Sequence, residues 1–340
     1  MQKMKSFDYD PPLACKEAAA QLLKSKSILL VPHVRIDGDA LGSMIACFRF
    51  FEESLGIKCC MYTPDKISER FAFMIKGIED RIETELPDGL HFDTVLRLEC
   101  PKEGRWPEGL VPAEWGDKVV NIDHHEGNDM GGDINWVEPE FSSLGEMLFF
   151  VFLEMGADFL KEIPAAEALY TAIVSDSGSF RFDSVAPRTL QAAANLREAL
   201  GGQASLVHEY LSRISLNNIQ LREDVTRTYE SFCGGKLFTA RLTKEMLDAH
   251  QAGSEDTDSL LAAINNVRGC QVFAFLKALD PDCVRVSLRS SADGPAVVHV
   301  AQKFGGGGHE RAAACRFAGK TIDEAEELLL PELKALFAER

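Results

Sequence analysis

Residues 27–39 have the sequence SILLVPHVRIDGD, an apolar run followed directly by a histidine and two aspartates. The run is short and rich in branched side chains, which is typical of a strand buried inside a parallel sheet. Beyond it we expect a helix over residues 40–55, with Asp39 as its N-cap residue and Gly56 after its end. A buried strand that leads through a polar turn into a helix is the repeating unit of open parallel sheets.

The same alternation continues along the chain and then gives way to a second, smaller set of elements. The sequence predicts strands over 57–62, 93–98 and 118–122 and helices over 143–155, 164–173 and 187–200. Farther on it predicts strands over 236–242, 270–279 and 283–288 and helices over 259–267 and 322–339, the last kinked or split at Pro331. We therefore expect an α/β protein. Its parts are a doubly wound, mostly parallel sheet with helices on both faces over 1–200, a linker over 201–216, and a smaller α/β domain over 217–340.

Composition narrows the class of protein. The chain has 340 residues, of which 46% are hydrophobic and 26% charged, as expected for a folded protein of two domains. Its N-terminus lacks the apolar core of a signal peptide, and its nine cysteines form no CxxC pair, so we expect a reduced, cytoplasmic protein without a membrane span. A net charge of −17 disfavours binding to a long duplex, which depends on cationic side chains.

Three groups of potential metal ligands follow predicted strands or helices. His33, Asp37 and Asp39 form the first group, Asp123–His125 the second, and Asp176 the third. The first two aspartates are two positions apart and can face different ions, and adjacent histidines point in different directions. Each residue alone also suits an ordinary role, such as a helix cap, a core histidine or a turn aspartate. Polar residues after parallel strands converge at one edge of the sheet, however, so we expect the groups to meet.

If these groups meet, about four carboxylates lie in one crevice. Like charges so close together raise one another's pKa values or destabilise the fold by repulsion. Two divalent cations would neutralise them. Mixed histidine and carboxylate ligands suit Mn²⁺, Fe²⁺, Co²⁺ or Zn²⁺ better than Ca²⁺ or Mg²⁺. Two such ions that share a hydroxide provide a nucleophile for attack at phosphorus. The residues alone therefore indicate a metal-dependent phosphoesterase.

Together these motifs resemble the DHH phosphoesterase superfamily. The stretches that carry the resemblance are VPHVRIDGDALGS at 31–43, NIDHH at 121–125, SS at 142–143 with Glu146, IVSDSGSFRF at 173–182, VSLRS at 286–290 and FGGGGHERAAA at 304–314. The last two resemble the DHH-associated domain, so the similarity spans nearly the whole chain. It implies a DHH domain followed by that second domain, with the active site in the cleft between them. It also implies hydrolysis of short oligoribonucleotides, of 3′-phosphoadenosine 5′-phosphate, or of both.

The resemblance further implies a role for each motif residue. Two Mn²⁺ ions would share a bridging hydroxide, one ion held by His33 and Asp37 and the other by Asp39, His124 and Asp176. His125 would contact the scissile phosphate, with Asp123 behind it. The residues that would bind the terminal phosphate and nucleotide are Arg289, Ser290, Gly305, Gly306, Gly307, Gly308 and His309. Glycine N–H groups and an arginine fork suit phosphate oxygens, and we expect the small residues after His309 to lie in a helix.

One position departs from the family pattern. Where the family carries an aspartate that bridges both metals, this chain has Glu99 at the end of the strand predicted over 93–98. Glutamate keeps the charge and adds one methylene. Either the distance between the two metal ions changes, or the backbone at residue 99 lies farther from them. We expect Glu99 to remain a ligand. Arg97, in the middle of the same strand where an apolar side chain is expected, has no explanation from sequence.

Several alternatives stay open on the sequence alone. The linear dinucleotide pApA is a related substrate that the motifs do not separate from short RNA. A non-catalytic nucleotide-binding module, with Glu99 as the mark of a lapsed centre, is disfavoured because the other ligands are all present. An inorganic pyrophosphatase lacks the glycine run in this form, and a long single-strand exonuclease needs a further domain. Dimers are common in the family, and the sequence leaves a homodimer open.

Overall fold

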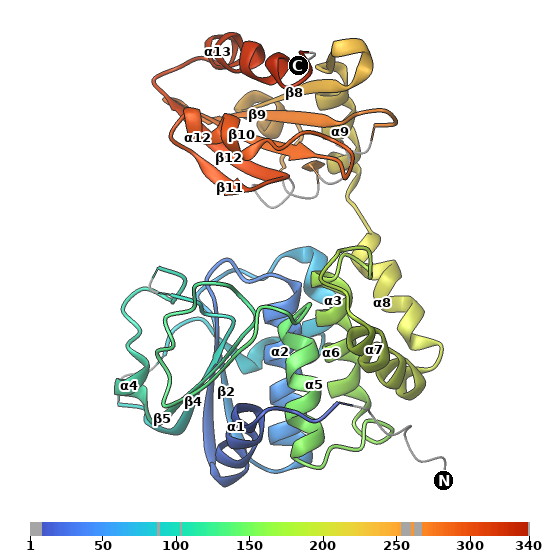
Figure 1. Ribbon diagram of the computed structural model, residues 1–340. Helices are drawn as coiled ribbons and strands as arrows, with labels where there is room; N and C mark the ends of the chain where they lie inside the picture. Colours follow the sequence, from blue (N-terminus) through green and yellow to red (C-terminus); the bar gives the residue numbers. More distant parts are fainter. Residues whose placement is uncertain (1–8, 87–88, 103, 253–259, 262–266, 339–340) are drawn as a thin grey trace. The chain divides into compact units, whose positions relative to one another are not determined.

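The computed structural model describes residues 9–86, 89–102, 104–252, 260–261 and 267–338 (Figure 1). The chain divides into two compact units, Met1–Arg213 and Ile214–Arg340. Each unit has its own six-stranded sheet and its own apolar core. Among the described residues, no helix has the length and apolar character needed to cross a bilayer.

The sheet of the first unit is entirely parallel, as the sequence predicts. Its strand order is β3-β2-β1-β4-β5-β6, and every neighbouring pair runs in the same direction. The strands are β1 (Ser27–Pro32), β2 (Lys58–Tyr62), β3 (Ile82–Glu83), β4 (Phe92–Leu98), β5 (Gly116–Asp123) and β6 (Ile134–Val137). Because the chain winds outward from β1 in one direction and then from β4 in the other, the sheet has a switch point between β1 and β4. Ligands of open α/β sheets bind at such a point, beyond the carboxyl ends of the strands.

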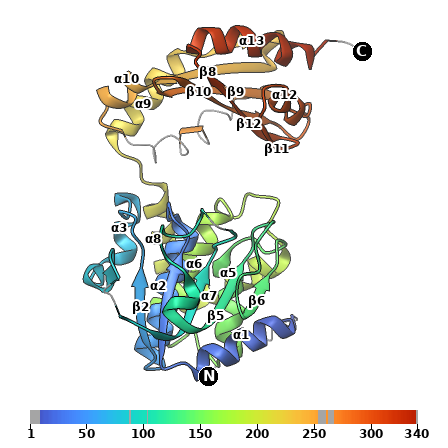
Figure 2. The ribbon, with the colours of Figure 1, turned by 90° about the vertical axis from the view of Figure 1, so that its left-hand side faces the viewer.

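Helices cover the two faces of this sheet unequally. One face packs against α1 (Leu13–Lys24), α2 (Gly38–Phe48), α5 (Leu144–Glu154), α6 (Ile163–Asp176), α7 (Pro187–Leu200) and α8 (Gln203–Ser212) in a single large core (Figure 1). The short elements are α3 (Ala72–Ile75), two 3₁₀ turns at Glu69–Phe71 and Glu79–Arg81, and α4 (Pro112–Trp115). The other face carries α4 and a smaller cluster that includes Val31, Val95 and Trp106. Figure 2 shows α1 at the lower edge of the unit, where it packs against α5 and β6.

The start of α2 differs from the expectation in two respects. Asp37, and not Asp39, is the N-cap residue, because its Oδ1 accepts hydrogen bonds from the backbone N–H groups of Asp39 and Ala40 at 3.1 and 3.0 Å. Asp39 therefore lies inside the first turn, where its side chain is free to point elsewhere. The α-helix ends at Phe48, and a π-helical turn over Arg49–Ser54 completes the expected length.

Gly38 is required by packing and not by an unusual backbone angle. A β-carbon at this position would overlap Ser175 of α6. Its φ lies outside the left-handed region, so backbone conformation is not the reason for a glycine here. The close approach of α2 to α6 brings Asp37 and Asp39 near the carboxyl end of α6.

The second unit has a mixed sheet with strand order β11-β12-β10-β9-β8-β7. Its strands are β7 (Glu230–Phe232), β8 (Leu237–Thr243), β9 (Val272–Asp280), β10 (Cys283–Ser290), β11 (Gly307–His309) and β12 (Ala312–Ala318). Its described helices are α9 (Leu216–Arg227), α10 (Lys244–Ala249), α12 (Val298–Lys303) and α13 (Ile322–Ala335). Only β8 and β9 are parallel, and α12 and α13 pack on one face while α9 and α10 pack on the other.

Two expectations for the second unit are wrong. The small residues after His309 form strand β12 and not a helix, because pairing with β10 overrides the helix propensity of alanine. The last helix is not split at Pro331, since it passes through the proline as one element, and it ends at Ala335 and not at residue 339. The helix expected over 259–267 lies mostly outside the described residues.

Candidate metal centre

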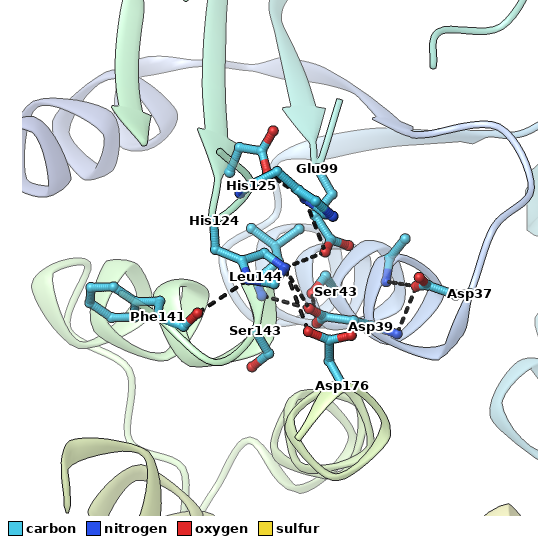
Figure 3. A network of polar contacts seen from close by, with 12 residues as sticks. Asp37, Asp39, Ser43, Glu99, His124, His125, Phe141, Ser143, Leu144 and Asp176 are labelled. Carbon is cyan, nitrogen blue, oxygen red and sulfur yellow. Dashed lines mark hydrogen bonds and ion pairs between the residues drawn. The ribbon is translucent and has the colours of Figure 1, made fainter. Parts of the chain in front are cut away.

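The acidic and histidine residues meet at the carboxyl edge of the first sheet. His33, Glu99 and His124 follow the ends of β1, β4 and β5, which are neighbours in the sheet. Asp39 reaches the same place from the first turn of α2, and Asp176 from the last residue of α6 (Figure 3). Ligand atoms within 4.8 Å of one another fall into three overlapping sets: His33, Asp37 and Glu99; Asp39, His124 and Asp176; and Glu99, His124 and His125.

His33 is prepared to act as a ligand through Nε2. It is buried, and its Nδ1 lies 2.9 Å from the carbonyl oxygen of Val34, which can only accept a hydrogen bond. Nδ1 therefore carries the proton, and Nε2 presents a lone pair. That buried Nε2 has no hydrogen-bond partner among the described residues and lies 3.5 Å from Oδ2 of Asp37.

Glu99 belongs to two of these sets, one with His33 and one with His124. Its Oε1 is 2.7 Å from Nε2 of His124, and its buried Oε2 has no hydrogen-bond partner among the described residues. The backbone at Glu99 has a φ of 59°, the left-handed region that side chains other than glycine, asparagine and aspartate seldom adopt. The longer glutamate is thus accommodated with a strained backbone at the end of β4.

Asp39 is held by the start of a different helix. Its two carboxylate oxygens accept hydrogen bonds from the backbone N–H groups of Leu144 at 2.6 Å and Gly145 at 2.9 Å, and from the hydroxyl of Ser43 at 3.2 Å. A helix N-terminus favours negative charge, so α5 orients and stabilises this carboxylate. Sequence reasoning missed this contact, although Ser143 and Glu146 carry the signal for a helix start at this place.

The electrostatics of the cluster call for cations. Burial raises the pKa of Asp39 and of Glu99 well above the ordinary carboxyl range, and neighbouring carboxylates add to the effect. Burial likewise raises the pKa of Asp176. At Asp37, burial acts in the same direction, but the nearby His33 and the N–H groups of α2 outweigh it and lower the pKa. Three of the four carboxyl groups therefore ionise fully only when positive charge is brought among them.

His125 is oriented by a second carboxylate. Its Nδ1 lies 2.9 Å from Oδ1 of Asp123, and Asp123 also accepts from the backbone N–H of His125 at 2.8 Å. Burial raises the pKa of Asp123, but these hydrogen bonds outweigh it and keep the pKa low. Asn128, which sequence reasoning missed, donates to Oδ2 of Asp123 at 2.6 Å. The side chain of His125 itself is 40% exposed.

The donor set fits divalent cations. Nε2 of His124 faces three carboxylates, with Glu99 at 2.7 Å, Asp176 at 3.7 Å and Asp39 at 3.8 Å. Its Nδ1 lies 3.2 Å from the carbonyl oxygen of Phe141, so Nε2 again presents a lone pair. A lone pair and carboxylates that point at one another are stabilised by a cation between them. The unpartnered atoms of His33 and Glu99 favour the same conclusion, and imidazole with carboxylate suits Mn²⁺, Fe²⁺, Co²⁺ or Zn²⁺.

The second unit brings its candidate residues to one end of its sheet. Arg289 and Ser290 end β10 and line a pocket of about 380 Å³. Arg289 pairs across the sheet with Ala312, which pairs in turn with His309, so the arginine and the histidine share one row. With strands about 4.8 Å apart, their backbones are separated by about 10 Å.

The glycine run has a structural role that the sequence did not reveal. The N–H groups of Gly305 and Gly306 donate to carbonyl oxygens of α12, at Gln302 and Ala301. A β-carbon at Gly306 would overlap the Ala314 carbonyl, whereas one at Gly307 would meet nothing within 4 Å. Packing therefore explains Gly306 and leaves Gly307 without a packing reason.

Comparisons with known proteins agree with this geometry. Residues 27–173 match the N-terminal domain of the DHH family, and residues 234–339 match the DHHA1 domain. A bifunctional oligoribonuclease and PAP phosphatase NrnA from Thermus thermophilus is 31% identical over 320 residues, which cover 93% of this chain and 92% of that protein. NrnA from Bacillus subtilis is 28% identical over 306 residues, covering 89% of this chain and 92% of that protein.

A solved structure shares the fold over the full length. An exopolyphosphatase-related protein from Bacteroides fragilis superposes with a TM-score of 0.82 at 21% identity, covering 98% of this chain and 100% of that one. The two domain matches and the extent of the similarity confirm the resemblance that the motifs indicate. The chain belongs to the DHH family of phosphoesterases, with a DHHA1 domain after its DHH domain, and is a phosphoric ester hydrolase.

Proposed function

We propose that this protein hydrolyses short oligoribonucleotides and 3′-phosphoadenosine 5′-phosphate at a centre of two divalent ions, Mn²⁺ foremost. The observation that carries the proposal is a pair of ligand sets at the carboxyl edge of the first sheet, one with His33 and Asp37 and one with Asp39 and Asp176, which a third set containing Glu99 and His124 connects. The names of the relatives from Thermus thermophilus and Bacillus subtilis support the same two substrates. The free thiol state of all nine cysteines is consistent with a cytoplasmic protein.

In this proposal the residues divide between the two ions. His33 and Asp37 would hold one ion and Asp39, His124 and Asp176 the other, and Glu99, which is grouped with His33 and also with His124, would be a ligand as well. Bound ions would neutralise the carboxylates and supply an activated water for in-line attack at phosphorus. The protein's own contribution is to fix the donors before substrate arrives, through the backbone of α5 at Asp39 and the carbonyl oxygens behind each imidazole.

His125 and Asp123 form the proposed contact with the scissile phosphate. Ionised Asp123 accepts a hydrogen bond from Nδ1 of the imidazole and so turns Nε2 toward the substrate, where the ring, once it takes up a second proton, would donate a hydrogen bond to a phosphate oxygen. His125 therefore orients the phosphate and stabilises the negative charge that develops on it.

The second domain supplies the proposed grip on the rest of the substrate. We assign residues 1–200 to the DHH domain, 201–216 to a linker and 217–340 to a substrate-binding DHHA1 domain. The residues proposed to bind the nucleotide and its terminal phosphate are Arg289, Ser290, Gly305, Gly306, Gly307, Gly308 and His309. A net charge of −17 leaves such local groups to hold a short anionic end and disfavours long duplex.

The test is hydrolysis by the purified full-length protein with Mn²⁺. We expect release of mononucleotides from RNA of two to five residues and release of phosphate from 3′-phosphoadenosine 5′-phosphate, both abolished by EDTA. Asp39→Ala should remove the activity, and Asp158→Ala, an exposed aspartate paired with Lys161, should not. Activity on pApA alone would overturn the substrate assignment. No turnover with Mn²⁺, Co²⁺ or Mg²⁺ would overturn the enzymatic proposal in favour of a nucleotide-binding module.

A further inference from the structure

Arg97 is an arginine buried in the middle of the first sheet. It lies in β4 with only 2% of its surface exposed, on the face that also carries Val95. A guanidinium is costly to bury unless its donors are paired. The hydrogen-bond partners of this guanidinium therefore indicate the role of Arg97.

One contact of Arg97 fixes the chain next to Glu99. Its Nη2 donates to the carbonyl oxygen of Cys100 at 2.6 Å. Cys100 follows Glu99, whose backbone holds the left-handed φ of 59°. A charge-assisted hydrogen bond on the adjoining carbonyl opposes relaxation of that strained residue. Through this contact Arg97 stabilises the backbone that places the Glu99 carboxylate among the metal ligands.

A second contact of Arg97 fixes the loop that follows the histidine pair. Nη2 also donates to Oδ1 of Asp129 at 2.8 Å, and the backbone N–H of Asp129 donates to the carbonyl oxygen of Pro101 at 2.6 Å. The next residue toward the N-terminus, Asn128, donates to Asp123 at 2.6 Å. Asp123 in turn holds Nδ1 of His125 at 2.9 Å. The guanidinium thus joins the turn after β4 to the loop after β5.

The surroundings of the guanidinium are shaped for it. Its central carbon lies 4.8 Å from the ring centroid of Trp106, a cation–π contact. A β-carbon at Gly131 would overlap Nη1 of Arg97, so a larger residue there requires the guanidinium to move. A lysine offers a charge but neither the planar fork nor the stacking face.

We propose that Arg97 is a positioning residue for the metal centre: it sets Glu99 and the Asp123–His125 pair in register with each other without touching metal or substrate. This inference rests on the proposed metal-dependent function. It gives a role to a buried charge that the family resemblance does not cover. It also connects Arg97 with the glutamate found two positions farther along the same strand.

The test uses three variants of the full-length protein and two matched controls. Arg97→Met keeps the length and removes the fork, Arg97→Lys keeps the charge, and Gly131→Ala displaces the guanidinium without changing it. Arg49→Met is the control for an arginine, since Arg49 also pairs with a carboxylate, Glu53, and lies over an aromatic ring, Phe48. Gly202→Ala is the control for the glycine, because a β-carbon there meets nothing within 4 Å.

Two readouts separate positioning from a merely structural role. Electron paramagnetic resonance of free Mn²⁺ measures affinity at a temperature where circular dichroism shows each variant folded. We expect Arg97→Met and Gly131→Ala to weaken Mn²⁺ binding by about 10- to 100-fold, Arg97→Lys to recover part of the loss, and the controls to match the wild type. With Mn²⁺ saturating, kcat should fall while KM changes by less than about threefold, because Arg97 does not touch the substrate.

The outcomes distinguish this inference from the proposed function. Wild-type protein that binds no Mn²⁺ would refute both. Wild-type protein that binds Mn²⁺ and hydrolyses short RNA, with Arg97→Met and Gly131→Ala equal to it in affinity and kcat, would overturn the role of Arg97 alone. A lowered melting temperature with unchanged Mn²⁺ affinity would likewise reduce Arg97 to a structural residue.

Discussion

Gly145 connects the packing of the helices to the geometry of the metal centre. It lies in the first turn of α5, and a β-carbon there would be 2.5 Å from the Ala172 β-carbon of α6 and 3.1 Å from the Leu169 carbonyl oxygen. Nonbonded carbons need about 3.5 to 4.0 Å, so Gly145→Ala requires α5 and α6 to separate by about 1 Å. Because the N–H of Gly145 donates to Asp39, that movement reaches a proposed metal ligand.

The expected change in the free energy of unfolding of Gly145→Ala follows from two opposing contributions. Overpacking a close helix contact costs about 1 to 3 kcal/mol, and alanine recovers up to about 1 kcal/mol of helix propensity over glycine. We expect Gly145→Ala to lower the free energy of unfolding of the metal-free first unit by about 1 to 2 kcal/mol and to weaken Mn²⁺ binding by about tenfold. All three tryptophans of the chain, Trp106, Trp115 and Trp136, belong to this unit, so their fluorescence in a urea titration reports on it.

A compensating substitution at Ala172 tests whether the contact between α5 and α6 sets the position of Asp39. Ala172→Gly removes the nearest carbon, so in the double variant the loss should be smaller than the sum of the single losses by at least about 0.5 kcal/mol. Gly202→Ala is the control and should leave both stability and Mn²⁺ affinity unchanged. Additivity within about 0.3 kcal/mol, or unchanged Mn²⁺ affinity in Gly145→Ala, would show that this contact does not set the position of Asp39.

The remaining predictions concern single ligands and the glycine run. Glu99→Asp should keep or raise hydrolysis of short RNA, because aspartate adopts the left-handed backbone more readily; loss of activity would show that the centre depends on the longer side chain. Burial raises the pKa of Asp176, so its contribution to stability is present below the ordinary value of 3.8 and is lost as pH rises through the folded-state pKa. In EDTA, wild-type protein should therefore lose stability relative to Asp176→Asn as the pH rises above the ordinary value of 3.8, and a constant difference in urea midpoint would contradict this. Gly306→Ala should destabilise the second unit, whereas Gly307→Ala, in open space, should keep its melting temperature and raise KM if a phosphate approaches the backbone there. Equal KM in Gly307→Ala and wild type would remove Gly307 from the proposed substrate grip.

The parts of the fold that sequence predicts well depend on neighbouring residues. The helix expected over 187–200 is observed as α7 with the same bounds, because Pro187 suits a first turn and Gly201 ends the helix with a φ of 55°. Branched apolar runs likewise fixed β1, β4 and β5 to within two residues, since a buried parallel strand needs such a run. The residues at the ends of these strands could therefore be placed at one edge.

The parts that sequence misses depend on distant partners. In the stretch Asp37–Gly38–Asp39 either aspartate suits an N-cap, and only the approach of α5, more than 100 positions away, shows where Asp39 points. The alanines of β12 favour a helix locally, and pairing with β10 decides against it. Arg97 has no explanation from sequence because the carboxylate that pairs with it, Asp129, lies 32 positions farther along the chain.

The most direct test of the two-ion centre is an anomalous difference map from crystals of the full-length protein soaked with Mn²⁺. We expect two peaks in the first unit, one bound by His33 and Asp37 and one by Asp39, His124 and Asp176, with Glu99 reaching both. A single peak, no peak, or peaks away from these residues would contradict the assignment of a dinuclear phosphoesterase centre to this edge of the sheet.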